Sequence, residues 1–354
     1  MNSYQLIYEL QNSAYRLISK LNIMNRSYIK NVSFYVPDGI ITNDDLSKQM
    51  DTSDEWIKTR TGISKRHAVN NSGQGPADLA VEATTKVLHK SNMSKDDIDF
   101  VIFATSTPDY FIPGSGSAFQ HKMGLNKIGV LDIRQGCSGF VYGLSVANEF
   151  IKGGSYKNIL VVGSEVQTTQ LDFTDEGRGT AVIFGDGAAA ALVCATSEDR
   201  GILSTHLHTD GQYVEELVSL YPSARLKGII TKEIIEQKKH HLSMNGREVF
   251  KHAVKRFPEV ILEGLDYNNL KLDDLDLVIP HQANKRITQA VQKKLNVDES
   301  KIFSNIHNYG NTTAASIGIA LSECLEQNKI QRNDIVILAA FGAGFYWGSV
   351  VIKW

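Results

Sequence analysis

The chain has 354 residues, of which 42% are hydrophobic, and a formal net charge of −2. This length and apolar content can build one large α/β unit or two domains with a substantial core. The near-neutral charge argues against a general nucleic-acid binder, although it allows local basic patches. The three cysteines, at positions 137, 194 and 324, form no disulfide framework and fit a reducing cytoplasm. No apolar run approaches the roughly 18 residues of a membrane span, so we expect a cytoplasmic protein that does not cross a membrane.

Residues 1–26 differ from the rest of the chain. Apolar residues recur there at helical spacing, but no continuous apolar core with a small-residue cleavage site follows, which argues against a secretory signal. Two interpretations stay open: Met24 is the true start, or the segment is a short amphipathic helix that packs on the body. We assign residues 1–26 to a helical or disordered N-terminal extension.

From residue 43 onward, helices and strands alternate. Capping residues predict helices that begin near Asn43 and near Asp54. The apolar pattern predicts further helices over 76–90 and 115–123, and strands over 97–103 and 158–163. Such a β-α-β-α order requires a mostly parallel sheet that is covered on both faces.

The stretch Lys127–Gly154, KIGVLDIRQGCSGFVYGLSVANEFIKGG, carries the main candidate for chemistry. Residues 128–133 predict a buried strand, and the later spacing of Phe140, Leu144, Ala147 and Ile151 predicts a helix. Cys137 lies where the strand turns into the helix. A helix start favours an anion and can lower the pKa of a thiol, and the flanking glycines would let a substrate approach the sulfur. A nucleophile and a buried structural cysteine are both compatible with this stretch alone.

The second half of the chain repeats the first. DDIDFVIF from Asp96 returns as DDLDLVIP from Asp273, and KNILVVG from Lys157 returns as RNDIVILA around Arg332. Pairing position 98 with 275 gives an offset of 177, and pairing 159 with 335 gives 176. A near-constant offset predicts two copies of one βαβαβ unit, with a site where helix starts converge.

Between the two copies, the segment 167–225 contains two features of interest. Residues 185–187, GDG, predict a tight turn between strands rather than a dinucleotide-binding loop. His206 and His208 would share one strand face, where they could bind a metal, but no third ligand is evident and we expect no metal site. The nearby segment Lys227–His241 is most simply a solvated stretch.

Three further features could serve the cysteine. His281 follows the predicted strand Leu277–Pro280, and Asn311 precedes the helix predicted over Thr312–Leu325. By the repeat, both lie at the tops of elements equivalent to those that carry Cys137, so the three residues could converge. The glycine-rich turn FGAGFYWG from Phe341 has backbone N–H groups that could bind an oxyanion. Each has a structural explanation when taken singly, namely a satisfied histidine, a capping asparagine and a hairpin turn.

Six motifs in order now suggest a family. DTSDEWIKTRTGISKRH, GCSGF, RGTAVIFGDGAAAALV, PHQANKRI, NYGNTTAASI and FGAGFYWGS resemble those of β-ketoacyl-acyl-carrier-protein synthase III, and the resemblance runs from about residue 27 to the end. It implies a homodimer with a thiolase-like α/β fold, in which two pseudo-symmetric βαβαβ halves form α-β-α-β-α layers. We place the half with the nucleophile at 27–200 and the half with His281 and Asn311 at 201–354.

The resemblance also implies a reaction. Cys137 matches the nucleophile that takes an acyl group from acyl-CoA, while His281 and Asn311 match the pair that binds the thioester of malonyl-acyl carrier protein. Loss of CO₂ would give an enolate that attacks the acyl-cysteine and forms a 3-oxoacyl-carrier protein, without any cofactor or metal. The N–H groups of Cys137 and Ala343 would then form the oxyanion hole.

The same comparison assigns binding residues. Those that match positions for CoA and its pantetheine arm are Trp56, Arg60, Arg178, Gly246 and Asn284. Trp56 and Arg60 also lie four residues apart, on one helical face, although a half-buried Trp beside a salt-bridged Arg has the same spacing. Lys251 and Arg286 match a basic patch where an acidic carrier protein would dock.

The chain departs from the family pattern at several positions. Arg134-Gln135-Gly136 stands where small alanines are usual before the cysteine, and Ile112 stands where an aromatic from the partner subunit often closes the acyl pocket. An acyltransferase or condensing enzyme of specialised metabolism, with a longer or β-keto acyl donor, therefore remains an alternative.

Three further alternatives are less favoured. Asn311 argues against an acyltransferase that forms no carbon bond, because this residue would serve the enolate. The presence of Cys137 argues against a catalytically silent subunit. A cysteine protease would need a cleft for an extended peptide, which the glycine-flanked cysteine and the tunnel motifs do not provide.

Overall fold

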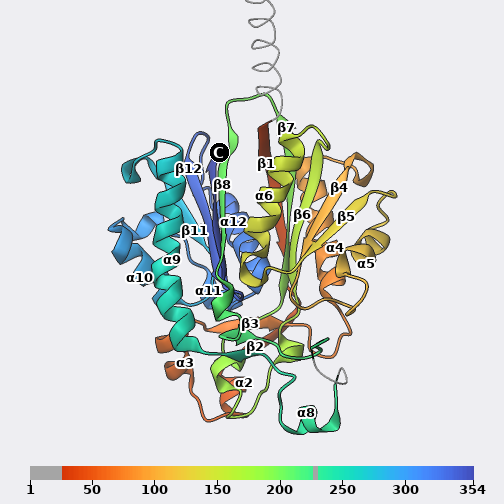
Figure 1. Ribbon diagram of the computed structural model, residues 1–354, viewed down its shortest axis with the longest axis vertical. Helices are drawn as coiled ribbons and strands as arrows, with labels where there is room; N and C mark the ends of the chain where they lie inside the picture. Colours follow the sequence, from red (N-terminus) through yellow and green to blue (C-terminus); the bar gives the residue numbers. More distant parts are fainter. Residues whose placement is uncertain (1–25, 226–229) are drawn as a thin grey trace, which may run out of the picture.

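Two β-sheets stand side by side with a pair of helices between them in the computed structural model, which describes residues 26–225 and 230–354 (Figure 1). The first sheet has five strands in the order β1-β7-β6-β4-β5. β4 is parallel to β5 and to β6, whereas β7 is antiparallel to β6 and to β1. The bounds are β1 Arg26–Tyr35, β4 Phe100–Ala104, β5 Gly129–Ile133, β6 Asn158–Glu165 and β7 Gly187–Thr196.

The second sheet repeats this arrangement with four strands in the order β11-β12-β13-β8. β11 and β12 are parallel, and β13 is antiparallel to β12 and to β8, so these strands correspond in turn to β4, β6, β7 and β1. The bounds are β8 Gly201–Thr209, β11 Leu277–Pro280, β12 Ile335–Gly342 and β13 Tyr346–Lys353. The duplication predicted from the repeated segments is confirmed.

The helices α6 (Gly139–Lys152) and α12 (Ser316–Glu326) form the central layer and are apolar on nearly all sides. The residues expected to share one face of α6, Phe140, Leu144, Ala147 and Ile151, are all part of the core between the sheets. Small residues allow the close approach, because a Cβ on Gly318 of α12 would lie 2.4 Å from the Cβ of Ala189 in β7.

Other helices cover the outer faces of the two sheets, which completes the α-β-α-β-α layers (Figure 1). The outer helices are α4 Pro76–Ser91 and α5 Ser115–Met123 on the first sheet, and α9 Gly246–Tyr267 and α10 Lys285–Leu295 on the second. Short elements are β2 Gly39–Thr42, α2 Asn43–Ser47, α3 Asp54–Thr61, β3 Lys65–Ala68, α7 Arg178–Ala181, β9 Leu217–Val218, α8 Lys232–Glu236, β10 Ser243–Met244 and α11 Ile306–Tyr309.

The capping predictions hold to within a residue. Ser53 caps α3 by accepting a hydrogen bond from the Trp56 N–H, as its sequence position indicated. Thr42, rather than Asn43, caps α2, and the Asn43 side chain instead donates to the Ile63 carbonyl at 2.8 Å.

Two local expectations differ from the structure. β5 was expected to be a buried strand, but it is an edge strand whose side chains are exposed or half-buried. Residues 185–187 do not join two strands of one sheet, because the short helix α7 precedes them and β7 follows. The described residues of the segment 227–241 are mostly exposed, as expected of a solvated stretch, and include the short helix α8. Residues 1–25, with the two interpretations of their role, and residues 226–229 lie outside the described part of the chain.

In the ranges 26–225 and 230–354, no helix has both the length and the apolar character needed to cross a membrane.

Along the chain, β7, the last strand of the first sheet, ends at Thr196, and β8, the first strand of the second sheet, begins at Gly201.

Candidate active site

Cys137 lies in a single 3₁₀ turn, Gly136–Ser138, between the end of β5 and the start of α6. Gly136 adopts a φ of 48°, a conformation that glycine tolerates better than other residues. The hydroxyl of Ser138 donates to the carbonyl of Tyr346 at 3.0 Å and so ties the turn to β13. The thiol is therefore held at the start of a central helix, with a side-chain exposure of 5%.

The glycine-rich turn between β12 and β13 lies directly against this cysteine. A Cβ on Gly342 would lie 2.9 Å from the sulfur of Cys137, so only glycine allows the backbone to come so close. The N–H groups of Cys137 and Ala343 both interact with the sulfur. Two backbone donors thus lie where a negative charge on or near the sulfur would need them.

The ionisation of Cys137 differs from the prediction. We expected the helix start to lower the pKa of the thiol. Instead, burial and, to a smaller extent, the carboxylate of Glu165 raise the pKa to about 12, against the two N–H groups that lower it. Desolvation of a thiolate in an apolar site outweighs the partial charge at the helix start. Cys137 is therefore a neutral thiol at pH 7.

Glu165, at the end of β6, is a site residue that the sequence reasoning missed. It is fully buried, and it accepts hydrogen bonds from the hydroxyls of Ser106 and Thr107 at 2.9 and 2.8 Å. Burial raises the pKa of Glu165 to about 7, although these donors favour the carboxylate. A charged residue at the end of the apolar run NILVVGSE was the signal that could have revealed it.

His281 follows β11, and its backbone N–H donates to the Ala339 carbonyl at 2.8 Å, which fixes it beside β12. Its Nδ1 lies 2.5 Å from the hydroxyl of Ser316, the first residue of α12, whereas its buried Nε2 has no partner among the described residues. Burial lowers the pKa of His281 to about 3, so the imidazole is neutral. If Ser316 donates to Nδ1, the ring carries its proton on Nε2 and can donate from there.

Asn311 is fixed at both its backbone and its side chain. Its N–H donates to the Ile183 carbonyl at 2.9 Å, and its Oδ1 accepts the N–H of Thr313 at 2.8 Å. Because the amide oxygen is occupied, the side-chain NH₂ group is the part of Asn311 that remains to bind a ligand. Asn311 and Thr313 lie just before α12, which begins at Ser316, and this segment packs against the start of α6 through Ala314 and Gly139.

A cavity of about 450 Å³ opens at Cys137. Its wall combines apolar and polar side chains from loops that follow β4, β5, β6 and β12 and from the segment after β8. The lining residues used below are Arg134, Cys137, Gln170, Phe184, Leu217 and Tyr346.

The three predicted catalytic residues thus gather at the starts of the two central helices, but they do not all face this cavity. Cys137 lines it, and Thr313 lines it beside Asn311, whereas His281 and Asn311 themselves are 2% and 4% exposed and are not part of its wall.

Three of the residues expected to bind CoA form one cluster. The guanidinium carbon of Arg60 lies 4.5 Å from the ring centre of Trp56, and that of Arg178 lies 5.2 Å from it. Arg178 also hydrogen-bonds the backbone carbonyl of Asp51. Two cations on one aromatic ring form a surface suited to a base and its phosphates.

Asn284 and Gly246 lie at the starts of two outer helices. Asn284 caps α10 by accepting the Arg286 N–H at 2.8 Å, and its side-chain NH₂ donates to the Arg60 carbonyl at 3.0 Å. A Cβ on Gly246 would meet only the tip of Met244, at 3.8 Å.

The other assigned positions lie at the surface. Lys251 pairs with Glu248 at 3.0 Å, and the Arg286 guanidinium lies 5.9 Å from the ring centre of Phe250. Ile112 is 82% exposed and does not line the cavity of its own chain.

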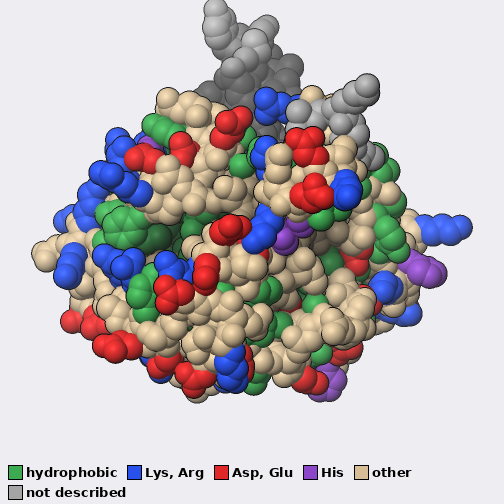
Figure 2. All heavy atoms as spheres, turned by 90° about the horizontal axis from the view of Figure 1, so that it is seen from below, with side chains coloured by type: hydrophobic (Ala, Val, Ile, Leu, Met, Phe, Trp, Pro, Cys, Tyr) green, Lys and Arg blue, Asp and Glu red, His purple; other side chains and the backbone are tan. Residues whose placement is uncertain are grey.

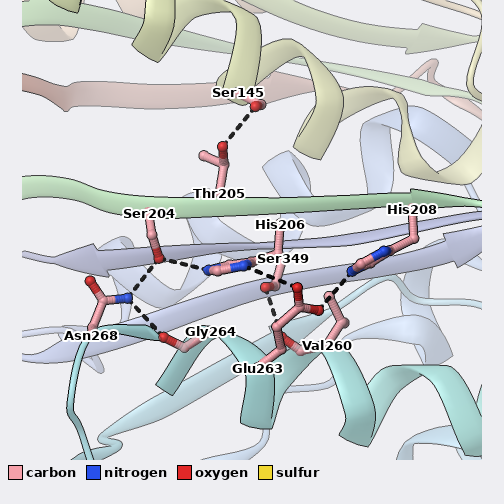
Figure 3. Close-up of polar contacts among 10 residues, drawn as sticks. All are labelled: Ser145, Ser204, Thr205, His206, His208, Val260, Glu263, Gly264, Asn268 and Ser349. Atoms are coloured by element: carbon pink, nitrogen blue, oxygen red, sulfur yellow. Dashed lines mark hydrogen bonds and ion pairs between the residues drawn. The ribbon is translucent and has the colours of Figure 1, made fainter. Parts of the chain in front are cut away.

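His206 and His208 share one side of β8, as predicted, and Figure 3 shows both rings directed at Glu263 of α9. His208 Nε2 lies 2.7 Å from one carboxylate oxygen and His206 Nδ1 lies 3.4 Å from the other. The remaining His206 nitrogen is 2.9 Å from the Ser204 hydroxyl. These contacts join α9 to β8, and no group of three or more His, Cys, Asp or Glu side chains in the described ranges could hold a metal ion.

Comparisons with known proteins agree with this geometry. Residues 131–211 match the family model described as 3-oxoacyl-[acyl-carrier-protein] synthase III, and residues 265–354 match the model of its C-terminal part.

Relatives named β-ketoacyl-[acyl-carrier-protein] synthase III are similar over nearly their whole length. The protein from Fusobacterium nucleatum is 40% identical over 92% of this chain and 98% of its own, and the one from Clostridioides difficile is 42% identical over the same shares. The crystal structure of 3-oxoacyl-[acyl-carrier-protein] synthase III from Aquifex aeolicus, which is 38% identical, matches with a TM-score of 0.85 over 93% of this chain and 100% of that one. The chain therefore belongs to the β-ketoacyl-[acyl-carrier-protein] synthase III family, as its motifs predicted, and has the thiolase-like fold of that family.

Proposed function

We propose that the chain is an acyltransferase that joins an acyl group from acyl-CoA to malonyl-acyl carrier protein. The sulfur of Cys137 attacks the thioester carbonyl, a new C–S bond forms, and CoA leaves as its thiol with the proton of Cys137. The observation that carries this proposal is the buried thiol at the start of α6, with the N–H groups of Cys137 and Ala343 directed at it. Those donors stabilise the oxyanion of the tetrahedral intermediate, by about 3 kcal/mol each in comparable sites.

The second step uses the other helix start. Malonyl-acyl carrier protein loses CO₂, and its thioester oxygen takes up the negative charge of the enolate. His281, which burial keeps neutral, and the NH₂ group of Asn311 donate hydrogen bonds to that oxygen. The enolate carbon then attacks the acyl-cysteine, a C–C bond forms, the C–S bond breaks, and 3-oxoacyl-carrier protein leaves.

The binding residues follow the same route. Trp56, Arg60 and Arg178 hold the nucleotide of CoA, while Asn284 and Gly246 border the path of its pantetheine arm. Lys251 and Arg286 attract the acidic carrier protein. Figure 2 shows that the face of the molecule seen from below carries Lys and Arg side chains around a hollow, with hydrophobic side chains beside it, a kind of surface that suits an acidic partner.

The reaction needs no cofactor in this proposal, because loss of CO₂ supplies the carbanion. We also propose a cytoplasmic homodimer. The unpaired edge of β5 carries Leu131 and Ile133, which are only half-buried, and the adjacent loop exposes Tyr110, Phe111 and Ile112. An edge strand with apolar side chains favours pairing with a second copy.

The test is a direct assay of both steps. Purified protein is incubated with a panel of acyl-CoA thioesters and malonyl-acyl carrier protein, and the products are examined by mass spectrometry. We expect an acyl adduct on Cys137, release of CO₂ and a 3-oxoacyl-carrier protein. The variant Cys137→Ser should lose the adduct, whereas Cys324→Ser should keep it. Release of no CO₂ with any thioester would refute the proposal, and transfer to an alcohol or amine would indicate the alternative acyltransferase.

A further inference from the structure

We infer that the acyl donor of this enzyme ends in a free carboxylate, which Arg134 binds in the cavity beside Cys137. The inference rests on the proposed function, because it names the acyl group that Cys137 accepts. It predicts a thioester of a short dicarboxylic acid rather than a simple fatty acyl-CoA.

Arg134 lies within reach of an acyl group on the cysteine. It follows β5 directly, three positions before Cys137, and both side chains line the same cavity. Three residues span at most about 11 Å even when fully extended. A guanidinium at this place can therefore meet the far end of an acyl chain of about four to six carbons.

Arg134 is exposed in the single chain, and its positive charge acts on the nearby carboxylate of Asp132 without a direct hydrogen bond. It forms no hydrogen bond and no ion pair with any residue in the described ranges. The carboxylate of Asp132 accepts the N–H of Gly116 at 2.8 Å; burial raises the pKa of Asp132, whereas this hydrogen bond and the charge of Arg134 lower it. The other carboxylate near Cys137, Glu165, is already occupied by donors from Ser106 and Thr107.

Two more polar side chains of the cavity wall are unused. Neither the Gln170 amide nor the Tyr346 hydroxyl makes a hydrogen bond to another described residue, although both line the cavity. Phe184 and Leu217 add apolar side chains to the wall of the same cavity. A hydrocarbon chain would displace water from the polar groups without replacing its hydrogen bonds, whereas a carboxylate would satisfy them.

The chemistry of acyl transfer is unchanged by this group. The thioester carbon of the donor exchanges its bond to the CoA sulfur for one to Cys137, and the distal carboxylate takes no part in bond making. Arg134 can bind both carboxylate oxygens at once through its planar N–H donors. Arg134 is thus a specificity-determining residue.

The experiment compares two donors with the same number of carbons. Glutaryl-CoA carries the distal carboxylate and pentanoyl-CoA lacks it. The rate of Cys137 acylation is measured for each by rapid quench and intact-protein mass spectrometry. We expect the wild-type protein to favour glutaryl-CoA by about tenfold or more, since a hydrogen bond to a charged group contributes that much to binding.

Variants of Arg134 then test the residue. Arg134→Gln should lower the ratio of the glutaryl to the pentanoyl rate by about tenfold, and Arg134→Lys should restore part of it. The matched control is Arg332→Gln, an exposed arginine paired with Glu198 near the opposite end of β12, which should leave the ratio unchanged. Thermal melting of each variant checks that it is folded.

The results separate the two claims. Acylation of Cys137 by pentanoyl-CoA at a rate equal to or above that of glutaryl-CoA, or an unchanged ratio in Arg134→Gln, would overturn the inference and leave the condensing function intact. Absence of an adduct with every thioester would refute the proposed function and the inference together.

Discussion

At the scale of single residues, the ionisation of Cys137 is decided by competing effects. The two N–H groups at the sulfur favour the thiolate, whereas burial and the charge of Glu165 oppose it. The thiol pKa of about 12 shows that burial and Glu165 together outweigh the two N–H groups. A buried cysteine of this kind is protected from chance electrophiles and reacts when a bound thioester lies against it.

Alkylation of Cys137 tests this balance. With a pKa near 12, its rate with iodoacetamide should be low at pH 7 and should rise about tenfold per pH unit up to pH 9. Glu165→Gln removes the negative charge, lowers the thiol pKa and should raise the alkylation rate at pH 8 by about fivefold. The rates are measured on the peptide that contains Cys137, with Cys194 as an internal control. A fast reaction at pH 7 in the wild-type protein would contradict the assigned ionisation.

His281 gives a prediction for stability. Its pKa is about 3 in the folded protein, below the usual 6.5, so between these values the unfolded chain binds a proton that the folded chain does not. The free energy of unfolding is therefore unaffected by protonation of this histidine above pH 6.5, and it decreases progressively as the pH falls from 6.5 towards 3. The loss at pH 4 is about 3 kcal/mol. Urea unfolding between pH 4 and 7 measures it, and the variant His281→Asn should lack this part of the pH dependence. An equal pH dependence in both proteins would show that His281 titrates normally when folded.

At the scale of elements, the site depends on how closely β12 approaches the start of α6. The approach is possible because position 342 has no side chain, and a Cβ there would lie 2.5 Å from the Cβ of Cys137. The end of β12 therefore fixes the place of the N–H of Ala343 relative to the sulfur.

The variant Gly342→Ala tests this contact. The added methyl group should destabilise the protein by about 1–3 kcal/mol. It should also slow acylation of Cys137 by about a hundredfold, because the donors and the sulfur move apart. Gly211→Ala is the control, since a Cβ at that position meets no atom within 4 Å. Unfolding in urea and single-turnover acylation are the measurements, and a fully active Gly342→Ala protein would show that this approach is not required.

At the scale of the whole molecule, duplication brings residues of two halves together. α6 and α12 begin side by side, so the cysteine of the first half meets the histidine and asparagine of the second. The same duplication is incomplete at one edge, because β5 has no full counterpart and only an isolated bridge between Val278 and Ile302 occupies that place. The unmatched β5 is the strand that we propose pairs with a second copy.

Ile112→Asp tests that pairing. The side chain is 82% exposed in the single chain, so the fold should not depend on it, but a charge there should weaken a dimer by at least about tenfold. Ile235→Asp on α8, where the side chain is 53% exposed, is the control and should leave the mass unchanged. Sedimentation equilibrium measures the molecular mass of each variant. Wild-type protein that sediments as a monomer would refute the proposed dimer.

The sequence by itself determined the elements, their duplication and the family. The apolar pattern was sufficient for α5, which begins and ends where that pattern indicated, and the offset between repeated strands was sufficient to match β4 with β11. The candidate catalytic residues Cys137, His281 and Asn311 were predicted from the sequence motifs in which they lie.

Only the tertiary structure decided the environment of those residues. The raised pKa of Cys137, the carboxylate of Glu165 and the hydroxyl of Ser316 beside His281 all depend on segments that are distant in sequence. The exposed edge of β5 likewise could not be read from its apolar residues, because a strand with a missing neighbour has the same composition as a buried one. Local sequence specifies the backbone, but desolvation and proximity arise only when the two halves pack together.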